Sequence, residues 1–192
     1  MTRSILMSAT FAAAMLLLSA SQPIARESEQ PSEPYEEGEI VHAVSDFFEI
    51  TTEGAARAVE RIFSRYGRPN AYIAGEEGAG AFILGLRYGK GVLYRKGHTP
   101  VTVYWQGPSV GFDIGANASK SFTLVYNLPD TDSIFQRFPG VEGTYYLVAG
   151  IGVNYQQNGD IILAPMRTGV GLRAGVNAGY LAYSRERNWV PL

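Results

Sequence analysis

The segment TGVGLRAGVNAGYLAY, residues 168–183, shows the pattern that decides the fold. Apolar residues occupy most of its even positions, while glycine, arginine and asparagine occupy its odd positions from 169 to 179. This period of two is typical of strands whose two faces meet different surroundings. Residues 110–117 (VGFDIGAN) and 149–155 (AGIGVNY) repeat the pattern. The sequence therefore predicts a two-sided sheet of glycine-rich strands.

Glycine along one face of a strand needs an explanation, because it supplies no side chain for packing and weakens the strand. Strong curvature, as in a small barrel, is one reason to keep it, and close approach of a helix or second sheet is another. A ligand groove is the alternative. Curvature and packing are the favoured interpretation here.

Further strands are expected wherever β-branched, aromatic or alternating residues lie between turn formers. They cover residues 71–74, 81–88, 91–96, 101–105, 109–116, 121–126, 144–155, 161–173 and 176–184. The separators include Glu77-Gly78 and Gly89-Lys90-Gly91, and residues 130–138 are expected to form a helical turn. A succession of hairpins predicts a small antiparallel β-barrel of about nine or ten strands.

Two amphipathic helices are expected before the strands. Apolar residues from Ile40 to Phe48 recur at three- and four-residue spacing, which is typical of one helix face. Thr51 or Thr52 can cap a second helix that ends at Gly67, with Pro69 beyond it. The fold class is therefore mainly β with N-terminal helices (α+β), the helical segment covering or plugging the barrel.

The N-terminus has the features of a secretory signal. Arg3 precedes an apolar stretch, residues 5–18, and Ala20 supplies a small residue for cleavage, with Ala25 a weaker alternative. The apolar stretch falls short of the roughly 20 residues that cross a bilayer, which favours cleavage over anchoring. We expect residues 1–20 to be a signal peptide and the mature chain to be exported and not integral to the membrane.

Residues 21–38 are rich in Ser, Gln, Pro and Glu and are expected to form a flexible linker that buries nothing. Residues 39–192 then form a single helix-plus-barrel domain. The chain has no cysteine, which excludes disulfides, thiolate metal sites, thiol nucleophiles and lipid attachment to a cysteine. The formal net charge is −2 and basic residues form no stripe, so nucleic acid is not an expected partner.

Residues that could carry catalysis are sparse. His42 and His98 lack metal-ligand spacing and are interpreted as solvated. The glycines of residues 78–85 (GAGAFILG) precede a strand, whereas a phosphate-binding loop precedes a helix. No catalytic residue, metal or cofactor is expected, and an enzyme is the weakest class of function.

The carboxylates have structural interpretations. Glu76 and Glu77 are expected to open a hairpin and to point to opposite faces. Asp130 and Asp132 flank a helix start, where capping explains them. Asp113 and Arg173 stand on the polar faces of two strands, and the pair is interpreted as structural, with binding of a ligand headgroup as the alternative.

Aromatic residues make up 12% of the chain. Most are expected to be core, but together they suit an apolar pocket with a few polar tips, as in small barrels that hold lipid-like ligands. The candidate ligand-binding residues are Tyr104, Trp105, Phe112, Asp113, Tyr145, Arg173 and Asn177.

Longer stretches resemble a known family. YWQGPSVGFD (104–113) and RTGVGLR (167–173) are the most distinctive, within a likeness that covers residues 35–192. They are similar to the EipA-like envelope-integrity proteins of Alphaproteobacteria, a domain of unknown function, and more distantly to the lipid-associated SYLF domain. The resemblance implies a periplasmic protein with an N-terminal helix packed on a small antiparallel barrel, and it supplies no catalytic residues.

Two functions remain open. The first is a non-enzymatic periplasmic protein that supports envelope integrity by binding a lipid-like or other amphipathic envelope component, or an envelope glycan. The alternative is a structural or interaction module that docks an envelope-assembly protein without a small-molecule ligand. An integral outer-membrane barrel is not favoured, because the expected strands are short and uneven against the roughly 9 to 11 residues needed to span.

Overall fold

The computed structural model describes residues 32–79, 86–108, 119–141, 146–168 and 179–188. Its helices are α1 (Glu37–Phe48), α2 (Thr52–Tyr66) and the 3₁₀ turn η1 (Asp132–Ile134). Its strands are β1 (Ala71–Ala79), β2 (Leu86–Tyr94), β3 (Val101–Pro108), β4 (Ser119–Tyr126), β5 (Arg137–Pro139), β6 (Tyr146–Val148), β7 (Ile151–Val153), β8 (Gln156–Asn158), β9 (Ile161–Arg167) and β10 (Tyr180–Ser184). Among these residues no helix is both long and apolar enough to cross a membrane.

The helix ends follow the sequence signals. The Thr51 side chain accepts a hydrogen bond from the Gly54 N–H at 3.2 Å, which caps α2. Gly67, at φ +72°, ends the same helix, and its N–H donates to the Phe63 carbonyl. α1 ends at Glu49 in the left-handed region, and Lys120 donates to the Phe47 carbonyl at 2.9 Å, so a strand residue satisfies the helix terminus. The predicted helices and caps are confirmed.

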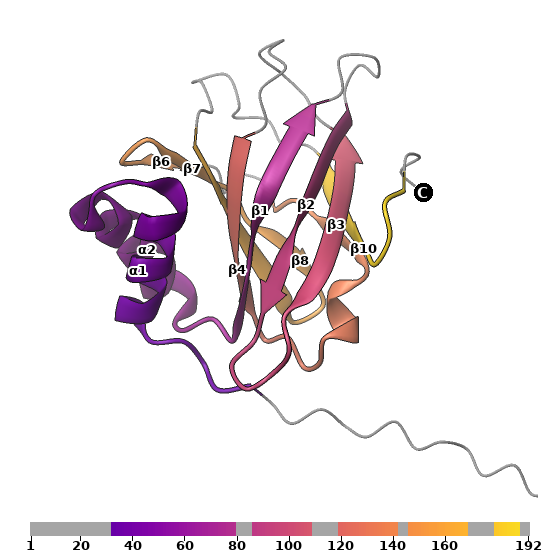
Figure 1. The fold of residues 1–192 in the computed structure, drawn as a ribbon, viewed down its shortest axis with the longest axis horizontal. Helices are drawn as coiled ribbons and strands as arrows, with labels where there is room; N and C mark the ends of the chain where they lie inside the picture. Colours follow the sequence, from indigo (N-terminus) through magenta and orange to yellow (C-terminus); the bar gives the residue numbers. More distant parts are fainter. Residues whose placement is uncertain (1–31, 80–85, 109–118, 142–145, 169–178, 189–192) are drawn as a thin grey trace, which may run out of the picture.

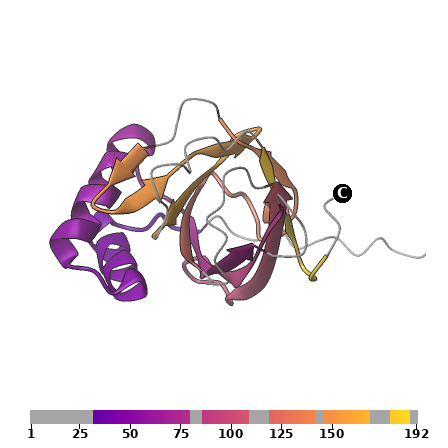
Figure 2. The ribbon, with the colours of Figure 1, turned by 90° about the horizontal axis from the view of Figure 1, so that it is seen from above.

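The described strands form one antiparallel sheet that curls into a barrel (Figure 1; Figure 2). Its order is β5-β10-β3-β2-β1-β4-β9-β7-β6, with β8 also paired to β9. The sheet closes where Gly140, just after β5, forms a bridge with Gln156 of β8. The Val141 N–H also donates to the Tyr155 carbonyl at 2.9 Å. The predicted α+β class with a small antiparallel barrel is confirmed.

The helices cover the barrel wall from outside (Figure 2). Apolar residues of both helices, including Val44 and Ile62, pack against Phe122, Leu124 and Met166 on the outward faces of β4 and β9. A second cluster fills the barrel interior with Ile73, Leu93, Val103, Leu163 and Phe138, all at most 2% exposed. The prediction that the helical segment covers the barrel is therefore correct, and the alternative that it plugs the barrel is wrong.

Two predicted turns lie inside strands. β1 continues through Glu77-Gly78, and β2 runs through Gly89-Lys90-Gly91 without a break. These glycines serve close packing: a Cβ on Gly89 would lie 2.0 Å from Trp105 Cε2, and one on Gly91 would lie 2.5 Å from the Ala74 carbonyl oxygen. Here the turn prediction was wrong, because glycine also fits where two strands or a large ring approach closely.

The predicted strand over residues 144–155 is also wrong as a single element. Ala149 and Gly150 both have positive φ, 50° and 80°, and form a turn that divides β6 from β7.

Residues 32–36, expected in the linker, are packed against the barrel: Ser32 Oγ donates to the Asn70 carbonyl and the Tyr35 N–H to the Pro69 carbonyl. The Tyr35 ring also meets Tyr72 edge-on at 5.2 Å.

Candidate functional site

Charged side chains gather inside the barrel at the end where β1, β3 and β9 finish, the upper end in Figure 1. Glu77, Arg87 and Arg167 come from β1, β2 and β9, and all three are buried. Alternation places them inside, because Glu77 follows Ile73 and Gly75 on the inward face of β1 and Arg167 follows Leu163 on β9. We call these residues, with Trp105, the buried charge cluster.

Glu77 is the centre of the buried charge cluster. Arg167 Nε donates to Glu77 Oε1, and Arg87 Nη1 lies 3.8 Å from the same oxygen. The Trp105 indole N–H donates to Glu77 Oε2 at 3.1 Å, and Arg167 Nη1 donates to Asn154 Oδ1 at 2.8 Å. The carboxylate on β1 thus contacts side chains from three other strands of the barrel wall, β2, β3 and β9.

The protonation states follow from burial and from the neighbouring charges. Burial alone would raise the pKa of the Glu77 carboxyl, but Arg167 and Arg87 outweigh it and hold that pKa below 4.5. Burial, reinforced by the nearby Arg167, lowers the pKa of Arg87 to about 10. Glu77 and Arg87 are therefore both charged at neutral pH, and Glu77 is a poor proton acceptor.

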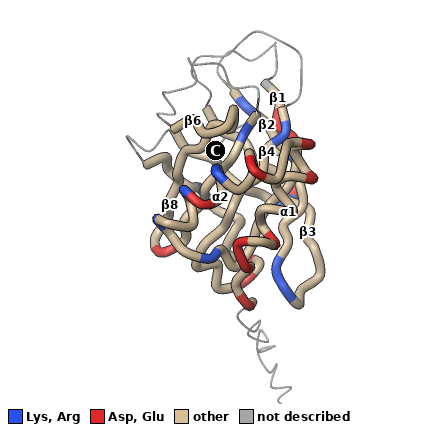
Figure 3. The backbone as a smooth tube through the Cα atoms, turned by 90° about the vertical axis from the view of Figure 1, so that its left-hand side faces the viewer, with Lys and Arg blue, Asp and Glu red and all other residues tan. Residues whose placement is uncertain are grey.

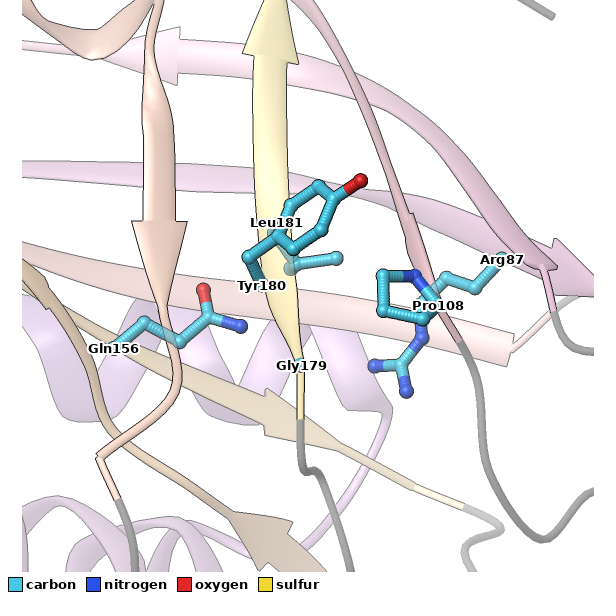
Figure 4. Close-up of a pocket in the computed structure, with 6 residues that line it drawn as sticks. All are labelled: Arg87, Pro108, Gln156, Gly179, Tyr180 and Leu181. Atoms are coloured by element: carbon cyan, nitrogen blue, oxygen red, sulfur yellow. The ribbon is translucent and has the colours of Figure 1, made fainter. Parts of the chain in front are cut away.

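A small pocket lies beside the buried charge cluster (Figure 4). Its lining residues are Arg87, Pro108, Gln156, Gly179, Tyr180 and Leu181. Gln156 Oε1 is buried and has no hydrogen-bond partner within the described residues. The pocket combines a guanidinium and an amide with the apolar surfaces of Pro108, Tyr180 and Leu181, and has room for about one water molecule.

The predicted ligand-binding residues are only partly placed. Trp105 points into the barrel and is 3% exposed, whereas Tyr104, its neighbour on β3, faces outward with Lys90 Nζ 5.8 Å from its ring centroid. Adjacent strand residues lie on opposite faces, so these two cannot share an interior pocket. The remaining five, Phe112, Asp113, Tyr145, Arg173 and Asn177, lie outside the described residues, as does the expected Asp113–Arg173 pair.

The carboxylates and histidines can be compared with expectation. Glu76 is exposed and Glu77 buried, which confirms their opposite orientations. The Ser133 N–H donates to Asp130 Oδ1 at 2.7 Å, which confirms capping by that residue, whereas Asp132 pairs with Arg185. His42 is exposed on α1. Across the described ranges, no three residues of the types His, Cys, Asp and Glu gather as metal ligands would.

Sequence reasoning missed the buried charge cluster for an identifiable reason. Glu77 was assigned to a turn, so its place in the alternation of β1 was not counted. Extending that period of two from Ile73 through Gly75 would have put Glu77 on the inward face. Its meeting with Arg87 and Arg167 depends on strand pairing, which spacing alone does not give.

A tyrosine outside the barrel offers a test of the packing between helices and sheet. The Tyr126 hydroxyl is buried and has no hydrogen-bond partner in the described part of the chain. We expect Tyr126→Phe to raise the free energy of unfolding by roughly 1 kcal/mol, because it removes an unsatisfied buried group. Tyr146→Phe is the matched contrast: it breaks the 2.9 Å contact with the Tyr155 hydroxyl and should lower stability. Urea unfolding measures both, and a loss of stability in Tyr126→Phe would contradict this assignment.

Comparison with known proteins identifies the family. A family model described as envelope integrity protein A matches residues 33–192. A solved structure described as a beta-barrel-like, uncharacterized protein from Brucella abortus is 46% identical, with a TM-score of 0.76. The match covers 83% of this chain and 99% of that one. A search of curated proteins gave no match. The curled sheet, the covering helices and these likenesses agree, and the chain belongs to the envelope integrity protein A family.

Proposed function

We propose that this protein acts in the periplasm and supports the cell envelope by binding an amphipathic envelope component, without catalysis. The family name links the chain to envelope integrity. Export is supported by the signal-like residues 1–20. A non-catalytic role is supported by Glu77, whose carboxylate is neutralised by two guanidinium groups and whose lowered pKa suits neither a general acid nor a general base at neutral pH.

The observation that carries the proposal is the mixed character of the pocket at the barrel end (Figure 4). An amphipathic molecule needs a polar partner for its headgroup beside an apolar surface for the rest. Polar contacts come from Arg87 and from Gln156 Oε1, which has no hydrogen-bond partner among the described residues, and Tyr180 and Leu181 supply apolar contacts. Because the pocket has room for about one water molecule, it suits only a single terminal group of a ligand and not a whole lipid chain.

A second candidate is supported by the filled interior. Below the buried charge cluster, the described barrel core is packed with Ile73, Leu93, Val103 and Leu163. Side chains packed in this way leave no space there for an acyl chain. This favours an interaction module that docks an envelope-assembly protein on its surface.

The test compares pocket variants with a variant on the outer wall. We expect native mass spectrometry of gently purified protein, and binding assays with a lipid extract, to reveal a retained amphipathic molecule. Gln156→Leu and Tyr180→Ala should lose it, whereas Tyr104→Ala should keep it, because Tyr104 faces outward. Retention by all three variants would exclude the pocket.

Measurements in cells separate the two candidates. Deletion of the gene should sensitise cells to detergent and envelope-directed antibiotics, and the pocket variants should fail to restore resistance. Full restoration by these variants, together with a reproducible crosslinked protein partner, would favour the interaction module. Unchanged sensitivity after deletion would contradict the envelope role itself.

A further inference from the structure

A second group of polar and aromatic residues lies outside the barrel, where α2 meets the β6–β7 hairpin and the start of β8 (Figure 1). It consists of Arg61, Arg65, Tyr66, Tyr146 and Tyr155, and we call it the arginine–tyrosine cluster. Figure 3 views the molecule from its helical side and marks basic and acidic positions interspersed along the backbone. This cluster differs from its surroundings in how its two arginines are held.

Both arginines rest on aromatic rings. Arg61 Cζ lies 4.7 Å from the centroid of the Tyr146 ring. Arg65 Cζ lies 5.2 Å from the Tyr155 ring and 5.4 Å from the Tyr66 ring. Such cation–π contacts are attractive, but they involve the face of the guanidinium group and do not use its N–H donors.

Three other cations on this side have carboxylate partners. Arg57 pairs with Glu53, Arg68 with Glu36, and Lys120 with Glu49. Within the described ranges, Arg61 and Arg65 have neither a carboxylate at ion-pair distance nor a side-chain hydrogen bond. Both are exposed. Their N–H donors are therefore available to a ligand.

The tyrosines make a firm platform beneath these arginines. Tyr66 packs edge-on against Tyr155, with ring centroids 4.7 Å apart, and the Tyr146 and Tyr155 hydroxyls are 2.9 Å apart. Tyr155 is 1% exposed. Rings held in this way restrict the arginines that lie over them, so less side-chain entropy is lost when a ligand binds.

The spacing and chemistry of the two arginines indicate which kind of ligand they can bind. Arg61 and Arg65 are four residues apart on α2, so their side chains leave the same helix face about 5 to 6 Å apart at Cβ. Guanidinium groups bind phosphate oxygens with paired N–H donors and more specifically than ammonium groups do. We propose that Arg61 and Arg65 together form a binding site for a phosphate group, carried either by free phosphate or by an anionic phospholipid headgroup. This site is separate from the barrel-end pocket and goes beyond the function proposed for it.

The test uses two double variants that remove the same charge. Arg61→Gln/Arg65→Gln eliminates the proposed site, and Arg57→Gln/Arg68→Gln removes two arginines that already have carboxylate partners. Protein is purified from the cell fraction in which it accumulates, and thermal unfolding verifies that each variant is folded. Calorimetry with inorganic phosphate and co-sedimentation with phosphatidylglycerol-containing vesicles measure binding.

We expect the first double variant to bind at least one of these probes roughly tenfold more weakly than wild type, and the second to stay within about twofold. If the first double variant loses only vesicle binding, the site is assigned to lipid headgroups. If it loses only phosphate binding, the site is assigned to a soluble ion. Binding of neither probe by wild type, or equal losses in both double variants, would overturn the proposal. Gln156→Leu changes the barrel-end pocket and not the arginine–tyrosine cluster, so this variant should bind phosphate normally. The two proposals can therefore fail independently of each other.

Discussion

Glu77→Ala is expected to destabilise the protein by roughly 3 to 5 kcal/mol, because removing one partner of a buried ion pair leaves the opposite charge uncompensated. Here two guanidinium groups, those of Arg87 and Arg167, face the lost carboxylate, and the Trp105 indole N–H loses its acceptor. Guanidinium chloride unfolding measures the effect. Glu76→Ala is the matched control, since Glu76 precedes Glu77 on β1 but is exposed.

A double variant tests the electrostatic origin of this loss. Glu77→Ala/Arg167→Met removes one of the two stranded charges, so it should be less destabilised than the sum of its single variants. Additive losses would contradict the view that the charges are coupled, and a Glu77→Ala protein as stable as Glu76→Ala would contradict the buried charge cluster itself.

The same carboxylate predicts a pH dependence. Arg167 and Arg87 overcome the effect of burial and hold the folded-state pKa of Glu77 below its ordinary value of 4.5. Glu77 therefore contributes stability that is fully present above pH 4.5 and is lost as the pH falls through the folded-state pKa. Glu77→Gln should show a flatter decline of unfolding free energy between neutral and acidic pH than wild type. Parallel declines would show that other carboxylates govern acid unfolding.

Gly89→Ala is the other substitution expected to have a large effect. A Cβ at this position would lie 2.0 Å from Trp105 Cε2 and 2.3 Å from Trp105 Nε1, well inside the contact distance. The indole cannot move away easily, because it is buried and donates to Glu77. We expect a loss of about 3 kcal/mol or more, at the upper end for overpacking.

Gly78→Ala is the control for Gly89→Ala, because no atom of the described residues lies within 4 Å of a Cβ at Gly78. Unfolding in urea should leave that variant within about 1 kcal/mol of wild type. Gly89→Ala combined with Trp105→Leu should show favourable coupling, since the smaller side chain makes room for the methyl group. If Gly89→Ala unfolds like Gly78→Ala, close packing does not explain the glycine in β2.

The accuracy of the sequence analysis depended on whether a signal was local. Helix capping at Thr51 and the stop at Gly67 are local, and both were correct. Gly89 and Gly91 were assigned to a turn because a local signal for glycine does not distinguish a bend from a close approach of another segment. In the structure that segment is β3 for Gly89 and β1 for Gly91, each brought there by strand pairing.

The candidate site shows the same difference between local signals and contacts that depend on strand pairing. Trp105 was selected as an aromatic near the pocket and lies in the buried charge cluster, yet Tyr104 was selected with it and faces the other way. Alternation says that neighbours occupy opposite faces but does not say which face is inside. On β4 hydropathy does not show which face points into the barrel, because both faces are covered: every residue from Ser121 to Tyr126 is buried.

The two amphipathic helices and the antiparallel succession of strands could be predicted from the sequence, because periodicity and turn chemistry act between near neighbours. The family likeness could be recognised from longer stretches such as residues 104–113. Tertiary structure decided that the helices cover β4 and β9 from outside, that Gly140 and Gln156 close the barrel, and that Glu77 meets Arg87 and Arg167. The physical reason is that both faces of the central strands are apolar or buried, one against helices and one against the barrel core. Only the pairing and closure of the whole sheet select which residues meet inside.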